Sequence, residues 1–179
     1  EGEEGAYGGY YTQDELRDLV KYAAERGITI VPEIEMPGHS AEVLTAYPEL
    51  SCTHEPYKQM DFCPGSVATY DFLENVLKEV MDIFPSKYIH VGGDEAFGMA
   101  DEAHAEFVER AIGLVRARAR LAVGWQEVAR AAIGPNDIAQ YWIDSRETGD
   151  MMDNEALQAM IPAEMLPLNR NEVLPGGNV

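Results

Sequence analysis

The stretch Tyr88-Ile89-His90-Val91-Gly92-Gly93-Asp94-Glu95 joins a short apolar run to two glycines and two adjacent carboxylates. An apolar run of this length is typical of a strand buried in a parallel sheet. The residues that follow, 96–115, have a mostly helical pattern. A barrel of parallel strands presents its chemistry in this order, because loops at the carboxyl ends of the strands carry the reactive side chains. We therefore expect Asp94 and Glu95 to lie at such an edge.

The two glycines matter for the geometry of the acids. Neighbouring side chains on a regular strand point to opposite faces, so Asp94 and Glu95 serve one site only if the backbone turns. Gly92 and Gly93 permit that turn at little steric cost. An adjacent Asp-Glu pair in so acidic a chain is more often structural. The complete run, with its histidine and glycines after an apolar strand, is much more specific.

The rest of the chain alternates apolar runs with amphipathic segments. Thr12 and Glu15 form a capping box in front of a helix, and Gly27 is placed to end it. This alternation predicts an α/β fold with a parallel sheet and four βα units. The expected strands are 28–34, 87–91, 121–125 and 138–143, and the expected helices are near 16–23, 41–46, 73–80, 101–115 and 128–133.

Two segments have no regular pattern. Residues 47–65 are expected to form a long irregular loop, which contains Cys52 and Cys63. A disulfide between them and two free thiols both fit, and the cysteines do not decide the redox compartment. Beyond residue 145 the signal weakens: residues 155–160 fit a helix, and prolines and glycines interrupt the remainder.

Composition limits the classes of partner. The chain has 179 residues, enough for one domain of ordinary size. With 13 basic and 32 acidic residues its net charge is −19, so nucleic acid and anionic membranes are not expected partners. No apolar stretch reaches membrane-spanning length, and the first residues do not resemble a signal peptide. Secreted, periplasmic and cytoplasmic locations all remain open.

Several motifs together point to a family. The run around Asp94 and Glu95, with Pro37-Gly38-His39 before it and Trp125 and Trp142 after it, resembles glycoside hydrolase family 20, the β-N-acetylhexosaminidases. These motifs occur in the family's order over residues 8–144. The resemblance implies a TIM (β/α)8 barrel of which residues 1–179 form a single partial catalytic domain, with residues 145–179 unassigned and irregular or helical. The four strands would be the third to the sixth.

The resemblance also implies a mechanism. Family 20 uses substrate-assisted catalysis, in which the 2-acetamido oxygen of the sugar attacks the anomeric carbon. Glu95 would be the general acid, and Asp94 would orient the acetamido N–H and stabilise the developing positive charge. The substrate would be a glycan ending in N-acetylglucosamine or N-acetylgalactosamine. No metal and no other cofactor is implied.

Further site residues follow from the same comparison. Trp125 and Trp142 match aromatic positions that wall the acetamido pocket, and His39 matches a histidine near the acids; each alone would more often be an ordinary core or loop residue. His90 would support the site from inside the strand. Glu33 and Glu35 share a strand face, where they support the site or bond to each other. The remaining histidines, His54 and His104, are expected at the surface.

The chain departs from the family pattern in specific places. The sugar-binding Arg of the first strand, the Asp of the second and the Trp of the eighth are missing. The family's Tyr and Asp after the seventh strand have only a poor local match at Pro167 and Asn169. These gaps affect the residues that bind the sugar more than the identity of the site. A partial barrel exposes two strand edges, so we expect it to be unstable, to self-associate or to belong to a longer protein.

Three alternatives stay open from the sequence. One is a catalytically incomplete homologue that binds sugar without hydrolysing it. Another is a family member that releases a disaccharide, such as a lacto-N-biosidase. The third is a metal-dependent barrel hydrolase using His90, Asp94 and Glu95, although no pair of histidines has the spacing of metal ligands.

Overall fold

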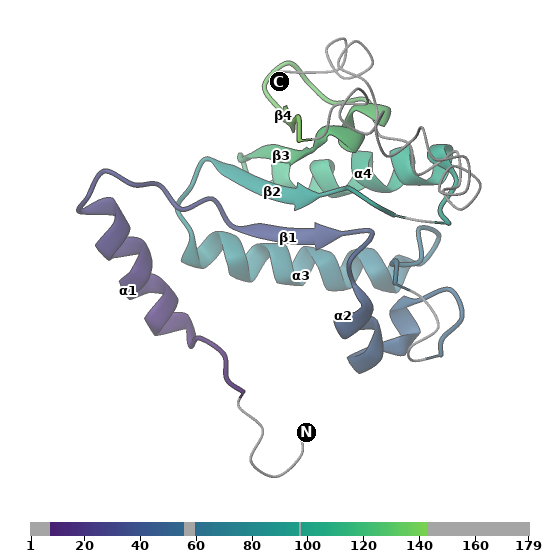
Figure 1. The fold of residues 1–179 in the computed structure, drawn as a ribbon, viewed down its shortest axis with the longest axis horizontal. Helices are drawn as coiled ribbons and strands as arrows, with labels where there is room; N and C mark the ends of the chain where they lie inside the picture. The colour runs from purple at the N-terminus through teal and green to yellow at the C-terminus, as the bar shows by residue number, and fades with distance from the viewer. Residues whose placement is uncertain (1–7, 56–59, 97, 143–179) are drawn as a thin grey trace, which may run out of the picture.

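The fold is seen in a computed structural model that describes residues 8–55, 60–96 and 98–142. Four parallel strands form one sheet whose spatial order follows the sequence (Figure 1). They are β1 (Glu33–Met36), β2 (Tyr88–Gly92), β3 (Leu121–Trp125) and β4 (Ile138–Gln140). Consecutive neighbours in a parallel sheet are what repeated βα units produce. The expected α/β class and parallel sheet are therefore confirmed.

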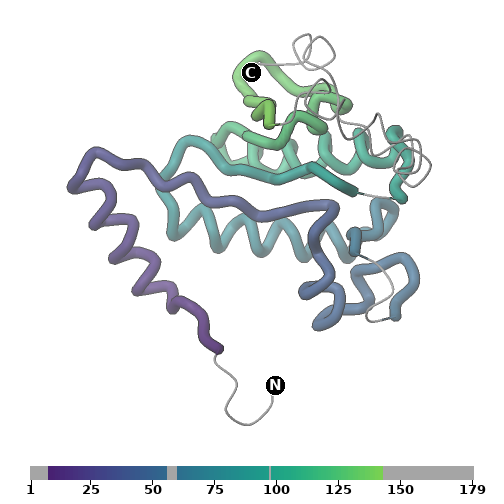
Figure 2. Tube along the Cα trace, viewed as in Figure 1, coloured from purple at the N-terminus to yellow at the C-terminus, as the bar shows by residue number. Residues whose placement is uncertain are grey.

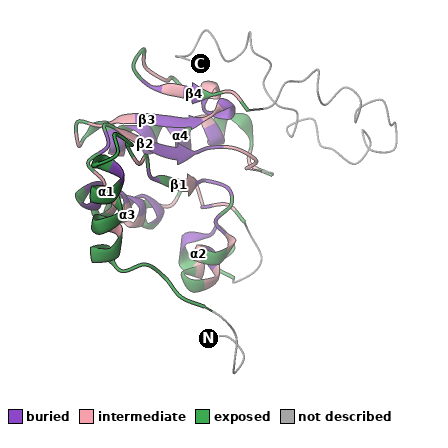
Figure 3. Ribbon diagram, turned by 60° about the vertical axis from the view of Figure 1, so that its left-hand side comes forward, coloured by how far each residue is buried: buried purple, intermediate pink, exposed green. Residues whose placement is uncertain are grey.

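Two long helices cover one face of this sheet. In Figure 1, α3 (Val67–Ile83) lies along β1 and β2, and α4 (Asp101–Arg116) lies behind β2 and β3. Strand side chains that alternate toward these helices are apolar and fully buried, among them Ile89, Val91 and Ala122. Figure 3 shows the resulting core between the sheet and the two helices. The sequence placed both helices correctly.

The first helix, α1 (Gln13–Ala24), begins and ends with the expected caps. The Thr12 hydroxyl accepts a hydrogen bond from the Glu15 N–H, and the Glu15 carboxylate accepts one from the Thr12 N–H. At the other end, Gly27 has a φ of +71° and its N–H donates to the Ala24 carbonyl. This helix is mostly exposed and lies at one end of the sheet (Figure 2).

Three predicted elements differ from the structure. The first strand runs from Glu33 to Met36 rather than over 28–34, because Pro32 has no N–H to donate and β2 continues to Gly92, which pairs with Met36. The predicted helix 128–133 is instead a 3-10 helix, η2 (Gln126–Arg130). The predicted strand 138–143 ends at Gln140 within the described residues.

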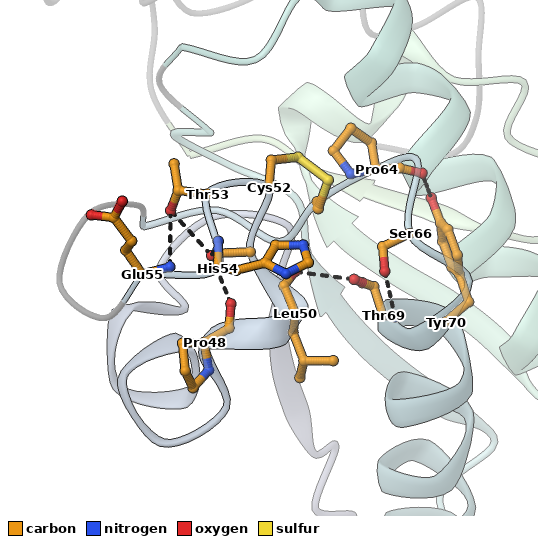
Figure 4. The surroundings of a disulfide bond; sticks show 12 residues. Pro48, Leu50, Cys52, Thr53, His54, Glu55, Pro64, Ser66, Thr69 and Tyr70 are labelled. Atoms are coloured by element: carbon orange, nitrogen blue, oxygen red, sulfur yellow. Dashed lines mark hydrogen bonds between the residues drawn. A yellow bond between two sulfur atoms is a disulfide. The ribbon is translucent and has the colours of Figure 1, made fainter.

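The described residues of the segment 47–65, which are 47–55 and 60–65, contain more regular structure than predicted. A short helix, α2 (Ala41–Ala46), leads into a 3-10 turn, η1 (Pro48–Leu50). Cys52 and Cys63 form a disulfide with a Cα–Cα separation of 4.8 Å (Figure 4). The alternative of free thiols is therefore wrong for this structure.

Two further expectations concern the C-terminal residues and helices that could span a membrane. Everything expected of residues 145–179 lies outside the described part of the chain. Among the described helices, none is long and apolar enough to cross a bilayer.

Candidate active site

The face of the sheet opposite the helices carries polar side chains. Glu33 and Glu35 alternate with the core residues of β1, and His90 alternates with those of β2. Glu33 and His90 stand opposite each other in the strand register, and the His90 Nδ1 lies 3.4 Å from a Glu33 carboxylate oxygen. The His90 ring is buried, as predicted. This polar face leads directly to the carboxyl ends of β1, β2 and β3.

The backbone turns at the end of β2, as the glycines predicted. Gly92 has a φ of +68° and Gly93 a φ of +98°, a region that side-chain-bearing residues rarely adopt. The Gly93 N–H donates a 2.9 Å hydrogen bond to Oε1 of Glu35. A Cβ on Gly92 would lie only 1.9 Å from the same oxygen. The turn therefore depends on glycine, and the side chain of Glu35 fills the space beneath it.

The turn brings Asp94 and Glu95, hereafter the dyad, beside His39. The Nε2 atom of His39 lies 3.2 Å from Oε2 of Glu95 and 3.7 Å from Oδ2 of Asp94. The two loops touch at Gly38, where a Cβ would lie 3.0 Å from the carbonyl oxygen of Asp94. His39 and Glu95 both have positive φ, +50° and +46°. Strained backbone of this kind is concentrated at functional sites.

His104 was expected at the surface, and that prediction is wrong. It lies on α4, its side chain is 1% exposed, and its Nε2 is 2.7 Å from the carbonyl oxygen of Gly93. A carbonyl only accepts hydrogen bonds, so Nε2 carries the proton. The available signal was its helical spacing with Phe107 and Ala111, which places it on the buried face of α4, and the surface prediction passed over that signal. His54 is exposed, as predicted.

The two tryptophans lie together beside the polar face. The Trp125 ring contacts the His90 ring edge-on at 4.8 Å and the Trp142 ring at 6.5 Å between centroids. The Trp125 Nε1–H donates to Glu33, and the Trp142 Nε1–H donates to Glu127 over 3.2 Å. Each indole is thus held by a carboxylate as well as by its neighbouring ring. The structure brings His39 to the dyad and pairs the tryptophans with each other.

Glu127 is a further candidate site residue, which sequence reasoning overlooked. It is buried in η2, two residues after Trp125. Burial raises its pKa, while the hydrogen bond from Trp142 lowers it. The only available signal was its position in the Gly124-Trp125-Gln126-Glu127 stretch. A carboxylate that fixes an aromatic wall cannot be recognised without knowing where the aromatic ring lies.

Burial and repulsion between neighbouring acids shift the pKa values of several other side chains. Burial is the largest cause that raises the pKa of Glu35 to about 9, and the nearby charge of Asp94 adds to it. Burial also lowers the pKa of His90 and of His104, which favours their neutral forms. The pKa of Asp61 is raised to about 6 by burial, opposed by the charge of His39. The carboxyl end of the sheet thus concentrates acids that differ in their tendency to ionise.

One cluster has the composition of a cation site. One ligand atom from each of His39, Asp94 and Glu95 lies within 4.8 Å of the others. This set contains His39 in place of the His90 considered in the sequence alternative. His90 Nδ1 instead accepts a 3.1 Å hydrogen bond from the Gly92 N–H. The same three groups also suit an acid catalyst with a histidine partner, so the donor set alone does not select a metal.

The disulfide braces the loop that carries His39. The Phe62 N–H donates to the Pro37 carbonyl, and the Ser40 N–H donates to the Met60 carbonyl, both over 2.9 Å. Residues 60–62 therefore run alongside the His39 loop, directly before the disulfide at Cys63. Figure 4 shows the hydrogen bonds of Thr69 and Tyr70 that attach the disulfide segment to α3.

Comparison with known proteins assigns the family. The sequence profile described as "Glycosyl hydrolase family 20, catalytic domain" matches residues 1–101, more than half of the chain. The chain belongs to glycosyl hydrolase family 20. A beta-hexosaminidase of Porphyromonas gingivalis is 32% identical over 169 residues, and a beta-N-acetylhexosaminidase of Cellulomonas fimi is 34% identical over 146 residues. These matches cover 79% and 77% of this chain.

Solved family 20 structures share the fold. The family 20 β-N-acetylhexosaminidase of Streptomyces coelicolor superposes with a TM-score of 0.73 at 33% identity, covering 79% of this chain and 30% of that one. The Streptomyces plicatus enzyme in complex with thio-NAglucal gives a TM-score of 0.74 at 34% identity, with 87% and 32% covered. The four strands and their helices are thus part of a TIM barrel. The chain spans 22% and 29% of the length of the two curated relatives.

Proposed function

We propose that this chain carries the acid dyad of a retaining β-N-acetylhexosaminidase that removes terminal N-acetylhexosamine from glycans or chitooligosaccharides. The observation that supports it best is the arrangement of Asp94 and Glu95 beside His39 at the carboxyl end of the sheet, following the turn at Gly92 and Gly93. In TIM-barrel enzymes this edge carries the active site. A solved relative was studied with the product GlcNAc, which favours an N-acetylglucosamine-type substrate.

In the proposed reaction Glu95 protonates the glycosidic oxygen as the bond to the leaving group breaks. The acetamido oxygen of the substrate attacks the anomeric carbon from the opposite face, giving an oxazolinium ion. Asp94 accepts a hydrogen bond from the acetamido N–H and offsets the developing positive charge. Water then attacks the anomeric carbon and displaces the acetamido oxygen, whose bond to that carbon breaks. Glu95 takes the proton of the water, and the β configuration is restored.

Three other side chains would prepare this reaction. His39 lies within reach of both carboxylates and can donate a hydrogen bond to Glu95 once that residue has lost its proton. Trp125 and Trp142 would wall the acetamido group and hold its oxygen over the anomeric carbon, a proximity effect. Their hydrogen bonds to Glu33 and Glu127 limit the orientations of the two indoles. No cofactor is needed, because the substrate supplies the nucleophile.

The test uses the full-length protein that contains this chain. We expect it to hydrolyse 4-nitrophenyl N-acetyl-β-glucosaminide and to leave 4-nitrophenyl β-glucoside, which lacks the acetamido group, almost untouched. Comparable rates on both would contradict substrate assistance. The galactosaminide and a lacto-N-biose glycoside establish sugar specificity. Proton NMR during the first turnovers should show the β anomer of the product.

Two controls separate the alternatives. Glu95→Gln should lower the hydrolysis of a chitooligosaccharide by about 10²- to 10⁴-fold while leaving sugar binding detectable by calorimetry. Binding without hydrolysis in the wild type would instead indicate a non-catalytic homologue. Activity that persists in excess EDTA would remove the metal-dependent alternative. The same assays on residues 1–179 alone would show whether part of the barrel assembles a working site through self-association.

A further inference from the structure

The carboxylate of Asp94 has one oxygen without a donor in the described part of the chain. Its Oδ2 faces His39, whereas its Oδ1 is buried and accepts no hydrogen bond from any of those residues. A buried acceptor left unsatisfied is costly, more so when it carries charge. The proposed reaction needs that carboxylate ionised and aimed at the acetamido group. A donor for Oδ1 is therefore expected close by.

Glu35 is the group in position to supply it. Its carboxyl group lies beneath the glycine turn, with Oε1 accepting from the Gly93 N–H and both oxygens within 2.3 Å of where a Gly92 Cβ would be. It also lies within hydrogen-bonding reach of the Asp94 carboxyl group. Two neighbouring carboxyl groups form a hydrogen bond with each other only if one of them keeps its proton.

The surroundings decide which of the two holds the proton. Glu35 is largely buried, and the charged groups that act on it are Asp94 across the turn and Glu33 on the same strand, both acidic. Its pKa is raised to about 9, mainly by burial, and the hydrogen bond from Gly93 only partly opposes this. Asp94, by contrast, has the His39 nitrogen 3.7 Å from Oδ2. Of these two carboxyl groups, Glu35 is therefore the one that keeps its proton at neutral pH.

We propose that Glu35 is a protonated carboxylic acid that donates a hydrogen bond to Asp94 and holds that carboxylate in its catalytic orientation. This inference rests on the proposed function, in which Asp94 orients the acetamido group. Glu35 is a positioning residue, because it acts through Asp94 and touches no substrate. Its own orientation is set from the other side by the Gly93 N–H.

The state of the proton can be measured without any activity. In the full-length protein at pH 7, infrared spectroscopy should show the C=O stretch of a protonated carboxylic acid that is lost in Glu35→Gln. Glu127→Gln serves as a matched control, since Glu127 is another buried glutamate with a raised pKa. No difference between wild type and Glu35→Gln in this band would overturn the proposal, whether or not the protein hydrolyses sugars.

The positioning role is tested by two substitutions of similar size. Glu35→Gln keeps an acceptor for Gly93 and a donor for Asp94, so kcat should stay within about threefold of wild type. Glu35→Met keeps the volume but removes both hydrogen bonds, so kcat should fall by about 100-fold. Equal losses in the two variants would show that the negative charge matters and would overturn the proposal.

A double variant separates positioning from general damage. If Glu35 acts through Asp94, Glu35→Met should cost little further activity in an Asp94→Asn background. Independent losses that multiply would contradict the proposed route. If no variant hydrolyses N-acetylhexosaminides, wild type included, the proposed function fails, and the infrared measurement still decides the protonation of Glu35.

Discussion

His104 donates a hydrogen bond from Nε2 to the carbonyl oxygen of Gly93, across 2.7 Å. This contact joins the glycine turn between β2 and the dyad to α4, the helix that follows it in the chain. The N–H of the same Gly93 donates to Glu35 on β1. The backbone N–H and the carbonyl of Gly93 are thus both hydrogen-bonded by side chains, one from β1 and one from α4. Gly93 lies immediately before the dyad.

Loss of His104 should therefore destabilise the protein and disturb the site. His104→Ala leaves a cavity and an unsatisfied carbonyl, and we expect it to lower the free energy of unfolding by about 2–4 kcal/mol. His104→Gln retains a donor and should lose less. His54→Asn is the matched control, because His54 is exposed at a φ of +57° that asparagine tolerates. Urea unfolding of the three variants measures the difference.

The same histidine makes stability sensitive to acid. Burial lowers the folded-state pKa of His104 below its ordinary value of 6.5. The unfolded chain therefore binds more protons as the pH falls below 6.5, so the contribution of His104 is present above that pH and is lost as the pH falls through the folded-state pKa. Relative to His104→Gln, the wild type should lose more stability between pH 6.5 and pH 5. Parallel pH profiles for the two proteins would contradict this.

The roles proposed for the dyad predict different responses to the leaving group. Glu95→Gln should lower kcat/KM by about 10²- to 10⁴-fold on a chitooligosaccharide, whose leaving oxygen needs a proton. The loss should be much smaller on a 4-nitrophenyl glycoside, because nitrophenolate leaves without one. Asp94→Asn should lower kcat/KM on both substrates by similar factors. If Glu95→Gln lowers kcat/KM by the same factor on both substrates, that result would contradict the role of Glu95 as general acid.

The disulfide should stabilise the loop beside His39. Cys52 and Cys63 are 11 residues apart, and closing such a loop is worth about 3 kcal/mol in the chain-entropy model. Cys52→Ser with Cys63→Ser should lower Tm and raise KM more than kcat falls, because residues 60–62 support the His39 loop. Reduction of the wild type should reproduce the effect and should leave the double variant unchanged.

The glycine turn should not tolerate a methyl group. Gly92→Ala would place Cβ 1.9 Å from a Glu35 oxygen at a φ of +68°, so we expect it to lower the free energy of unfolding by at least about 2 kcal/mol. Gly113→Ala is the control, and its expected effect on stability has the opposite sign. That glycine lies inside α4, and no atom of the described residues is within 4 Å of an added Cβ, so alanine should stabilise by about 1 kcal/mol. Thermal unfolding compares them.

Glu35 predicts a further pH dependence of stability. Its pKa rises from 4.5 to about 9 on folding, so the folded state binds more protons than the unfolded state between these values. Its contribution to stability is therefore full below pH 4.5 and is lost as the pH rises toward 9. Glu35→Gln removes this titration, and its unfolding free energy should fall less with rising pH than that of the wild type. Identical slopes would contradict a protonated Glu35.

Patterns that are local in sequence were predictable. The α1 cap needs only Thr12, Glu15 and Gly27, which lie near one another in the chain. The run from Tyr88 to Glu95 was sufficient to predict a buried parallel strand and a turn before the acids. Local periodicity also located the long helices α3 and α4.

Contacts between distant segments were not predictable in the same way. Residues 28–34 are apolar enough for a strand, but the strand forms only where the chain pairs with β2, which is over Glu33–Met36. The pairing of Trp142 with Glu127 and the contact of His104 with Gly93 likewise depend on how separate elements pack. Periodicity indicates that one face of a helix or strand is apolar, but it does not indicate which element packs against that face.

The sequence by itself determined the order of strands and helices, the glycine turn and the identity of the acids, because each depends on backbone preferences within a few residues. Only the tertiary structure decided that Glu35 lies beneath the turn, that His104 holds Gly93 and that Cys52 is bonded to Cys63. These relationships join parts of the chain whose distance in space is set by the packing of the whole sheet and its helices.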